Sequence, residues 1–353
     1  MDNETITQFQ NRILEWYEGS ARTLPWRNNP SPYRVWISEI MLQQTRVDTV
    51  RPYFEKFIDA LPTIEALAHT SDDKLLKLWE GLGYYSRARN LKRAANIILQ
   101  KFSGQIPSDI KALESLPGIG PYSSGAIASI AFGARVPAID GNVLRVMARV
   151  SANKGDITNR LVNKEIKELV NTLLPKERIG DFNQALMELG ASICLPNGLP
   201  KCLQCPINFT CEGYHRDMVA MIPMKLKKKP RKIERKTVFV MKSEGRVALR
   251  QRPSEGLLSN LWELPHVEGH LSYEDCQSTL IEWSASVFKI IKLDKAKHIF
   301  THMEWHMIGY LVLIETQIED SSLVWATPKE IETVYSIPTA FKAYLEYFIF
   351  KDK

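Results

Sequence analysis

The spacing of apolar residues divides the chain into a long helical part and a shorter part rich in strands. Up to about residue 221, apolar residues recur at intervals of three and four, as between Asn142 and Val150, which predicts amphipathic helices. After residue 237 apolar and polar residues alternate, and TVFVMKSEGRVALRQR predicts two strands joined by a turn at Glu244-Gly245. We therefore expect a mainly α-helical domain followed by an α/β domain.

A basic segment separates the two parts. Residues 225–236 read KLKKKPRKIERK, in which eight of twelve residues are basic and one is acidic. Such a run is typical of a solvated linker, and it can also follow a phosphate backbone. We place the helical domain at 1–221, the linker at 222–236 and the second domain at 237–353.

A turn with two glycines, PGIGP at 117–121, lies between two helical patterns. Ser108 is the expected N-cap of the short helix before it. Glycines permit a sharp turn that leaves N–H groups free at the start of the next helix, where a phosphate can bind. A plain helix–helix connection has the same appearance, so the turn alone does not decide its function.

Four of the five cysteines lie together, and their spacing indicates a metal site. They are Cys194, Cys202, Cys205 and Cys211, separated by seven, two and five residues. Both zinc and a [4Fe–4S] cluster are held by four thiolates, so the spacing leaves both open. We interpret Cys276, which stands apart, as an ordinary thiol.

Composition and the absence of targeting signals limit the partners and the cellular compartment that we expect. The net charge of +6 favours a polyanionic partner, although only weakly. The N-terminal pattern lacks the basic start and apolar core of a signal peptide, and no run of about 18 apolar residues occurs. We expect no membrane span, no disulfides and a soluble protein of a reducing compartment.

Two carboxylates occupy positions suited to acid–base chemistry. Glu39 lies in a helical pattern beside Val35, Trp36 and Leu42, so burial should raise its pKa and keep it protonated, as a general acid requires. Asp140 starts the next helix, where N–H groups favour the anion. An exposed glutamate and a structural cap are the ordinary alternatives. Together the two would suit cleavage of a glycosidic bond, including an N-glycosidic bond to a base.

Several motifs carry a resemblance to a known family. They are LPWR (24–27), WISEIMLQQT (36–45), EGLGYYSRARNL (80–91), LPGIGPYSSGAI (116–127), IDGNVLRV (139–146), FNQALMELGA (182–191) and the four cysteines. The chain resembles the MutY-type adenine-DNA glycosylases of the endonuclease III-like helix-hairpin-helix superfamily. GLLSNLWELP (256–265) and Phe300-Thr301-His302 resemble the family's Nudix-like domain, which reads 8-oxoguanine.

The resemblance implies a fold and a function. The fold is a helical glycosylase domain, with a six-helix lobe at about 29–135 and an iron–sulfur lobe at 1–28 and 136–221, followed by an α/β Nudix-like domain. The function is excision of adenine mispaired with 8-oxoguanine or guanine in duplex DNA, in base excision repair. We expect a monomer, located in the cytoplasm with the bacterial nucleoid.

The resemblance also implies roles for particular residues. The catalytic group comprises Glu39, Asp140, Asn142 and Tyr122. The adenine pocket comprises Arg22, Trp26, Arg27, Leu42 and Gln184. DNA is contacted by Gln44, Tyr84, Leu116, Gly118 and Gly120. The residues at 8-oxoguanine are Phe300, Thr301 and His302. One [4Fe–4S] cluster is held by Cys194, Cys202, Cys205 and Cys211.

Tyr122 separates two chemistries. The bifunctional relatives carry a lysine at this position that forms a Schiff base with the sugar, whereas no lysine occurs here between Pro117 and Asn153. This predicts a monofunctional enzyme. The rival hypotheses are a bifunctional glycosylase/lyase acting on oxidised pyrimidines and a non-catalytic binding module with a metal centre. Tyr122 disfavours the first, and the two carboxylates in their motifs disfavour the second.

The chain departs from the family pattern in three places. Seven residues, where six are usual, separate Cys194 from Cys202, and a loop rich in proline and glycine absorbs the extra residue. Thr301 stands where serine is usual, which keeps the hydroxyl and adds a methyl group. The second domain lacks the glutamate-rich segment of Nudix hydrolases, so we expect recognition there without pyrophosphate hydrolysis.

Overall fold

The computed structural model describes residues 1–224 and 230–349, so residues 225–229 of the expected basic linker lie outside the described residues. The chain forms two compact units. Unit 1 comprises Met1–His69 and Arg89–Lys227, and unit 2 comprises Thr70–Ala88 and Lys228–Lys353. Across the described ranges, no helix combines the length and apolar character needed to cross a membrane.

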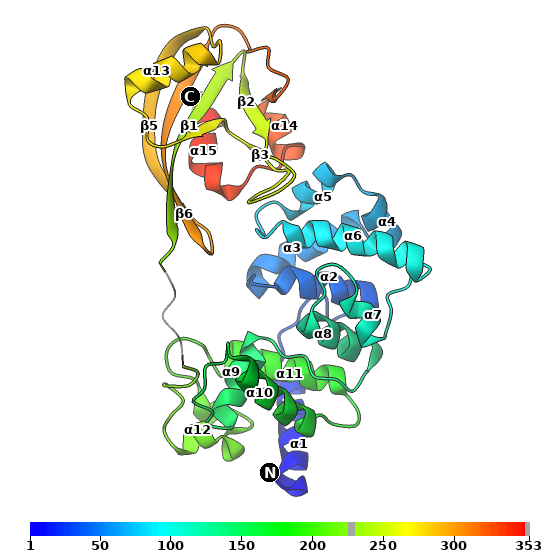
Figure 1. Ribbon diagram of the computed structural model, residues 1–353. Coiled ribbons are helices and arrows are strands. Elements are labelled where there is room, and N and C mark those ends of the chain that lie inside the picture. The colour runs from blue at the N-terminus through cyan, green and yellow to red at the C-terminus, as the bar shows by residue number, and fades with distance from the viewer. Residues whose placement is uncertain (225–229, 350–353) are drawn as a thin grey trace. The chain divides into compact units, whose positions relative to one another are not determined.

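Unit 1 is helical, as the apolar spacing predicts (Figure 1). Its main helices are α1 (Asn3–Ser20), α2 (Pro32–Leu42), α3 (Val47–Ala60), α4 (Ile64–His69), α6 (Ser86–Lys101, of which unit 1 holds the part from Arg89), α7 (Ile110–Glu114), α8 (Pro121–Phe132), α9 (Gly141–Val150), α10 (Arg160–Leu173) and α11 (Ile179–Ser192). Short helices follow around the cysteines: η1 (Cys202–Gln204), η2 (Asn208–Thr210) and α12 (Glu212–His215).

The N-cap of α7 differs from the expectation. Asp109, and not Ser108, caps this helix, because its carboxylate accepts the Ala112 N–H at 2.9 Å. A carboxylate one residue closer to the helix satisfies a free N–H and also favours the helix dipole.

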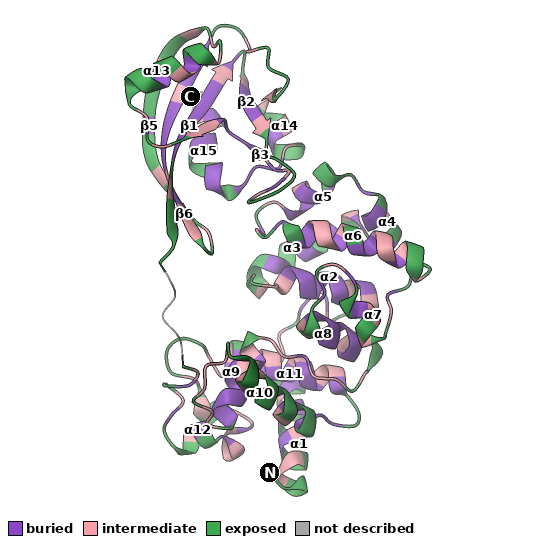
Figure 2. Ribbon diagram, viewed as in Figure 1, coloured by how far each residue is buried: buried purple, intermediate pink, exposed green. Residues whose placement is uncertain are grey.

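Helix α8 forms the centre of unit 1. It packs against α2 and α11, and Figure 2 shows it buried along most of its length. Its small residues allow this close approach: a Cβ at Gly125 would lie 2.4 Å from the carbonyl oxygen of Pro137. A second packing group joins α11 to α1 and α9 through residues such as Phe9, Val146 and Phe182. The segment that leads into α9 is thereby held against α8.

The C-terminal part of unit 2 is an α/β domain, which confirms the expected fold class (Figure 1). Its strands are β1 (Lys232–Ser243), β2 (Arg246–Gln251), β3 (Trp262–Glu263), β4 (His266–Glu268), β5 (Val287–Ile299), β6 (Met303–Ile314) and β7 (Leu323–Ala326). Its helices are α13 (Tyr273–Glu282), α14 (Pro328–Thr333), η3 (Thr339–Phe341) and α15 (Lys342–Ile349); unit 2 also holds α5 (Asp72–Trp79).

The sheet has the order β3-β2-β1-β6-β5, with β4 beside β1 and β7 beside β2. Strands β1 and β6 run parallel, and Glu234 is paired with Trp305. Alternate residues of β1 enter two cores: Val238 and Val240 pack with α15, whereas Phe239 and Met241 pack with α13. The predicted Glu244-Gly245 turn joins β1 to β2, and both of its residues have positive φ.

Candidate active site

A cavity of about 570 Å³ in unit 1 brings together residues from the segment after α1, from α2 and from α8, α9 and α11. Most of the predicted site residues of unit 1 line it: Arg22, Trp26, Arg27, Glu39, Leu42, Gln44, Gly120, Tyr122, Asp140, Asn142 and Gln184. Leu116 and Gly118 belong to the adjoining hairpin. Segments about 160 residues apart thus share one site.

Glu39 is buried on α2, with an exposed fraction of 5%. Ser31 caps this helix and Pro32 starts it, which sets the face that carries Glu39. The Tyr122 hydroxyl donates a hydrogen bond to Glu39 Oε2 at 2.5 Å. Burial raises the pKa of Glu39 to about 7, the hydrogen bond from Tyr122 opposes the rise, and the Asp140 charge adds to it. The carboxyl group is therefore poised to give up a proton near neutral pH.

This pKa predicts a pH profile. If the protonated carboxyl of Glu39 is the active form, single-turnover base excision should be constant just below about pH 7 and fall about tenfold per pH unit above it. Protonation of Asp140 would reduce the rate at the acid end. Rapid-quench measurements at fixed ionic strength would record the profile, and a rate that stays flat or rises above pH 7 would exclude Glu39 as the acid.

Asp140 is the N-cap of α9. Its Oδ1 accepts the Val143 N–H at 2.7 Å, and its Oδ2 accepts the Asn142 side-chain amide at 2.7 Å. Burial raises the pKa of Asp140, and these hydrogen bonds oppose the rise. Because both carboxylate oxygens are engaged, the side chain has a defined orientation in the cavity.

Arg145 links this group to the cysteine segment, and it is not among the residues predicted from the sequence. Its guanidinium donates to Asn142 Oδ1 at 2.9 Å, to the Gly190 carbonyl at 2.6 Å and to the Cys194 carbonyl at 2.9 Å. Gly190 is required here, since a Cβ would lie 2.6 Å from Asn142 Cβ. The spacing of three residues from Asn142 on α9 is the signal that could have indicated Arg145.

A buried carboxylate, Glu188, organises the arginine side of the cavity and was also missed. Arg22 Nε lies 2.5 Å from Glu188 Oε1, and Arg27 Nη2 lies 2.9 Å from Oε2. Burial opposes the charge of Glu188, but its bonds to the two arginines outweigh that effect and lower its pKa. Arg27 also donates to Gln184 Oε1 at 3.2 Å. The four-residue spacing of Gln184 and Glu188 on α11 could have indicated this pair.

The hairpin before α8 presents a free helix N-terminus. Gly118 has φ +81°, and a Cβ there would lie 2.9 Å from Asn90 Cβ, so glycine is required. Gly120 is the N-cap of α8 and supplies no side-chain cap, and Pro121 follows it. Leu116 is buried beneath the turn. Uncapped N–H groups at the start of a helix of twelve residues suit an anion such as phosphate.

Gln44 and Tyr84 share a special backbone conformation. Gln44 in unit 1 has φ +57° and Tyr84 in unit 2 has φ +47°. Few residues other than glycine adopt such values, and they concentrate at functional positions. Both side chains are exposed.

The four cysteines line one cavity in unit 1, and all are free thiols. Burial raises the pKa of Cys205 to about 12 and that of Cys211 to about 11. Arg149 Nη1 lies 3.2 Å from Cys194 Sγ and donates to the Leu195 carbonyl at 2.9 Å. By its chemistry the set, four thiols with a guanidinium beside one of them, is of the kind that binds a metal centre through thiolates. In the described parts of the chain, no three His, Cys, Asp or Glu side chains are grouped to hold a metal ion.

In unit 2, Tyr84 and Phe300-Thr301-His302 lie together. The Tyr84 hydroxyl is 2.9 Å from Thr301 Oγ1. Phe300 packs edge-on against Trp305 with ring centroids 4.9 Å apart, and Thr301 and His302 are exposed. Two exposed polar side chains thus follow directly after a phenylalanine that is packed against a buried ring.

Comparison with known proteins defines the class. A family model for the HhH-GPD superfamily base excision DNA repair protein matches residues 37–172, and a model for the NUDIX domain matches residues 237–347. The structure titled as a thermostable thymine-DNA glycosylase is 32% identical and covers 61% of this chain and 98% of its own, with a TM-score of 0.55. Fold and site therefore define a helix-hairpin-helix base excision repair protein with a NUDIX domain.

The relatives narrow the class to one family. Adenine DNA glycosylase of Rattus norvegicus is 32% identical over 97% of this chain and 78% of its own length. That of Buchnera aphidicola subsp. Baizongia pistaciae is 36% identical over 88% of this chain and 87% of its own. The chain belongs to the adenine DNA glycosylase family, which confirms the resemblance seen in the sequence.

Proposed function

We propose that this chain is a monofunctional glycosylase that removes adenine paired with 8-oxoguanine or guanine from duplex DNA. The main support is one cavity that holds two carboxyl groups in different environments. Glu39 is buried and bonded to a phenol, whereas Asp140 is bonded to an amide and a helix N-terminus. This is the arrangement that cleavage of a glycosidic bond requires.

Glu39 is the general acid. It transfers its proton to N7 of adenine, so the base leaves with the electrons of the N-glycosidic bond as a neutral molecule. Tyr122 holds the carboxyl group through its hydroxyl. Arg22, Arg27 and Gln184, with Leu42 and Trp26, form the wall against which adenine lies.

Asp140 stabilises the positive charge that develops on the sugar when the bond breaks. Asn142 and the Val143 N–H hold its oxygens in place. Water then adds to C1′ and gives a proton to the Glu39 carboxylate, which restores the acid and leaves an abasic site. No lysine lines the described cavity, and Tyr122 occupies the position where a lyase needs an amine.

Duplex DNA is the partner. The N–H groups at the start of α8 suit a phosphate, and Gln44 and Tyr84 suit insertion into the base stack beside a flipped adenine. Thr301 and His302 offer hydrogen-bonding groups to 8-oxoguanine, with Phe300 beneath them. The net charge of +6 favours binding of the polyanion, and we expect the chain to act as a monomer.

Cys194, Cys202, Cys205 and Cys211 would hold one [4Fe–4S] cluster. The cluster would supply a rigid cross-link for the segment whose carbonyl at Cys194 accepts from Arg145. Hydrolysis is carried out by the residues of the cavity that holds Glu39 and Asp140, and the cluster takes no part in it. Iron and sulfide analysis of anaerobically purified protein, beside zinc analysis, tests this assignment, and stoichiometric zinc would contradict it.

An alkali assay tests the proposed function. Duplexes that carry adenine opposite 8-oxoguanine, guanine or thymine are incubated with the protein and then divided, and one half is heated in alkali. We expect breaks at the adenine only after alkali, fastest opposite 8-oxoguanine and absent opposite thymine.

Other outcomes of the same assay would contradict the proposal. Breaks without alkali would indicate lyase chemistry, and a duplex with an oxidised pyrimidine tests that alternative directly. Binding of all duplexes without release of adenine would indicate a non-catalytic module.

A further inference from the structure

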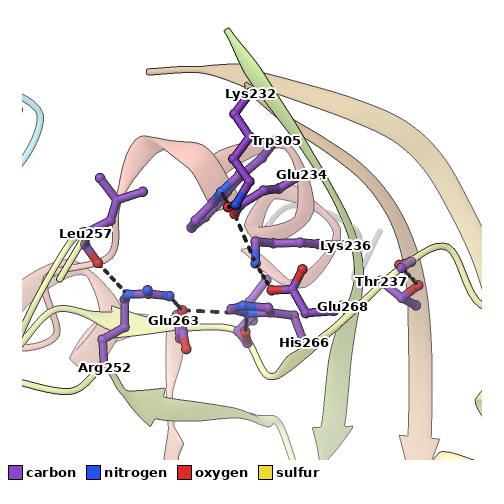
Figure 3. Close-up of polar contacts among 12 residues, drawn as sticks. Lys232, Glu234, Lys236, Thr237, Arg252, Leu257, Glu263, His266, Glu268 and Trp305 are labelled. Atoms are coloured by element: carbon purple, nitrogen blue, oxygen red, sulfur yellow. Dashed lines mark hydrogen bonds and ion pairs between the residues drawn. The ribbon is translucent and has the colours of Figure 1, made fainter. Parts of the chain in front are cut away.

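Trp305 is the buried base on which Phe300 packs. Its exposed fraction is 1%, and its ring meets the Phe300 ring at 70° with centroids 4.9 Å apart. The indole Nε1 donates to Glu234 Oε2 at 3.1 Å. Figure 3 shows the Trp305 ring beside Glu234 and Lys236 of the neighbouring strand β1.

One of the charges beside this ring, Lys236, is unusually buried. The Lys236 side chain is only 5% exposed, and its Nζ lies 4.8 Å from the Trp305 ring centroid. It forms ion pairs with Glu268 at 2.5 Å and Glu234 at 3.8 Å (Figure 3). A lysine is rarely buried, and an apolar residue there would usually be as stable or more so. Burial of this lysine therefore indicates a role beyond stability.

These charged residues lie at the end of β1 that is next to the loop Phe300-Thr301-His302. Residues 232, 234 and 236 lie on the sheet face that carries Val238 and Val240 further along, and these three charged side chains follow one another at the end of β1 that borders Phe300-Thr301-His302. Lys242 lies at the opposite end of the same face. The loop is fastened at the end with the three charges, since the Lys232 N–H donates to the His302 carbonyl at 3.2 Å and the Phe300 N–H donates to the Met303 carbonyl at 2.9 Å.

We propose that Glu234, Lys236 and Trp305 are positioning residues for the loop Phe300-Thr301-His302. Glu234 fixes the indole through its N–H, and Lys236 attracts the ring face. Lys232 donates to Glu234 Oε1 at 2.9 Å, and Lys236, 3.8 Å from Oε2, adds a weaker attraction to the same carboxylate. The orientation of Trp305 sets that of Phe300 and hence of the two exposed side chains. This inference rests on the proposed function of the loop, and it assigns to these residues the strength of the preference for 8-oxoguanine over guanine.

Binding measurements with three variants test the proposal. Trp305→Phe keeps a ring and removes the N–H, Glu234→Leu removes the acceptor, and Glu234→Gln keeps an acceptor without charge. Glu268→Gln is the matched control, since Glu268 pairs with Lys236 but its side chain is 74% exposed. The full chain is titrated with duplexes carrying a non-hydrolysable 2′-fluoro analogue of deoxyadenosine opposite 8-oxoguanine or guanine.

We expect Trp305→Phe and Glu234→Leu to lower the ratio of the two affinities by about three- to tenfold, with affinity for the guanine duplex unchanged. Glu234→Gln should restore most of the ratio, and Glu268→Gln should leave it within about twofold. A merely structural role would weaken both duplexes together and lower the melting temperature, and either that result or an unchanged ratio would overturn the proposal.

Variants of the loop itself distinguish a failure of the positioning role from a failure of the proposed function. If Phe300→Ala and Thr301→Ala lower the ratio while Trp305→Phe and Glu234→Leu do not, the positioning role fails and the proposed function stands. If wild type binds both duplexes equally and the loop variants change nothing, both are overturned.

Discussion

Glu39→Gln should abolish base excision and leave DNA binding intact. Glutamine has nearly the volume of glutamate and can still accept the Tyr122 hydrogen bond, but it has no proton to donate at neutral pH. General acid catalysis contributes about a hundred- to ten-thousandfold, so we expect a loss of about a thousandfold in the single-turnover rate. A gel-based excision assay measures the rate, and fluorescence anisotropy measures the affinity.

Glu15→Gln is the matched control, because it removes a carboxylate from the exposed side of α1. Near-normal turnover of Glu39→Gln would exclude Glu39 as the general acid. Loss of DNA binding would show that the substitution disturbs binding and does not isolate the proton transfer.

The same substitution should change stability in a pH-dependent way. Glu39 has a raised pKa in the folded state, so the unfolded chain loses this proton first and stability falls as pH rises from about 4.5 to about 7. Glu39→Gln escapes this loss and should be more stable than wild type at about pH 8, by up to about 3 kcal/mol. The difference should shrink toward pH 5 in chemical denaturation, and an advantage that grows toward acid pH would contradict the assigned direction.

Arg145→Met should have the second largest effect. It removes the guanidinium that donates to Asn142 and to the carbonyls of Gly190 and Cys194. These three acceptors then lose this hydrogen-bond donor in the interior of the protein. Each buried acceptor left unpaired costs about 1–3 kcal/mol, and a displacement of Asn142 misplaces Asp140. We expect excision to fall at least about a hundredfold and thermal stability to fall as well.

Arg160→Met on the exposed side of α10 is the control, and Arg145→Lys should recover only part of the activity, because one ammonium cannot reproduce the planar set of donors. Iron content should be measured with the rate. A stable Arg145→Met variant that excises adenine at the normal rate would show that Asn142 and Asp140 keep their geometry without it.

The pattern of apolar residues predicted the types of secondary structure correctly. Helices over the first part and strands after residue 237 follow from side-chain periodicity, and the Glu244-Gly245 turn follows from a glycine between two strand patterns. The N-cap of α7 was wrong by one residue, because Ser108 and Asp109 are both good caps and only the backbone geometry decides between them.

The candidate site was predictable in part. Glu39 stands out because it is a carboxylate among apolar neighbours on one helix, and its burial bears out that environment. Glu188 and Arg145 do not stand out, because their importance lies in partners up to 166 residues away. Spacing on α9 and α11 places each of them beside a predicted site residue, but it carries no information on partners that come from other elements.

The sequence by itself determined the two kinds of domain, the family and the types of reactive group. These depend on local residue spacing and on short motifs, both of which can be read along the chain. Only the tertiary structure decided which charges meet. It joined Glu188 to Arg22 and Arg27, Arg145 to Asn142 and Cys194, and Lys236 and Glu234 to Trp305. The reason is physical: a buried charge is tolerated only where folding supplies its partner, and that partner comes from another element of the fold.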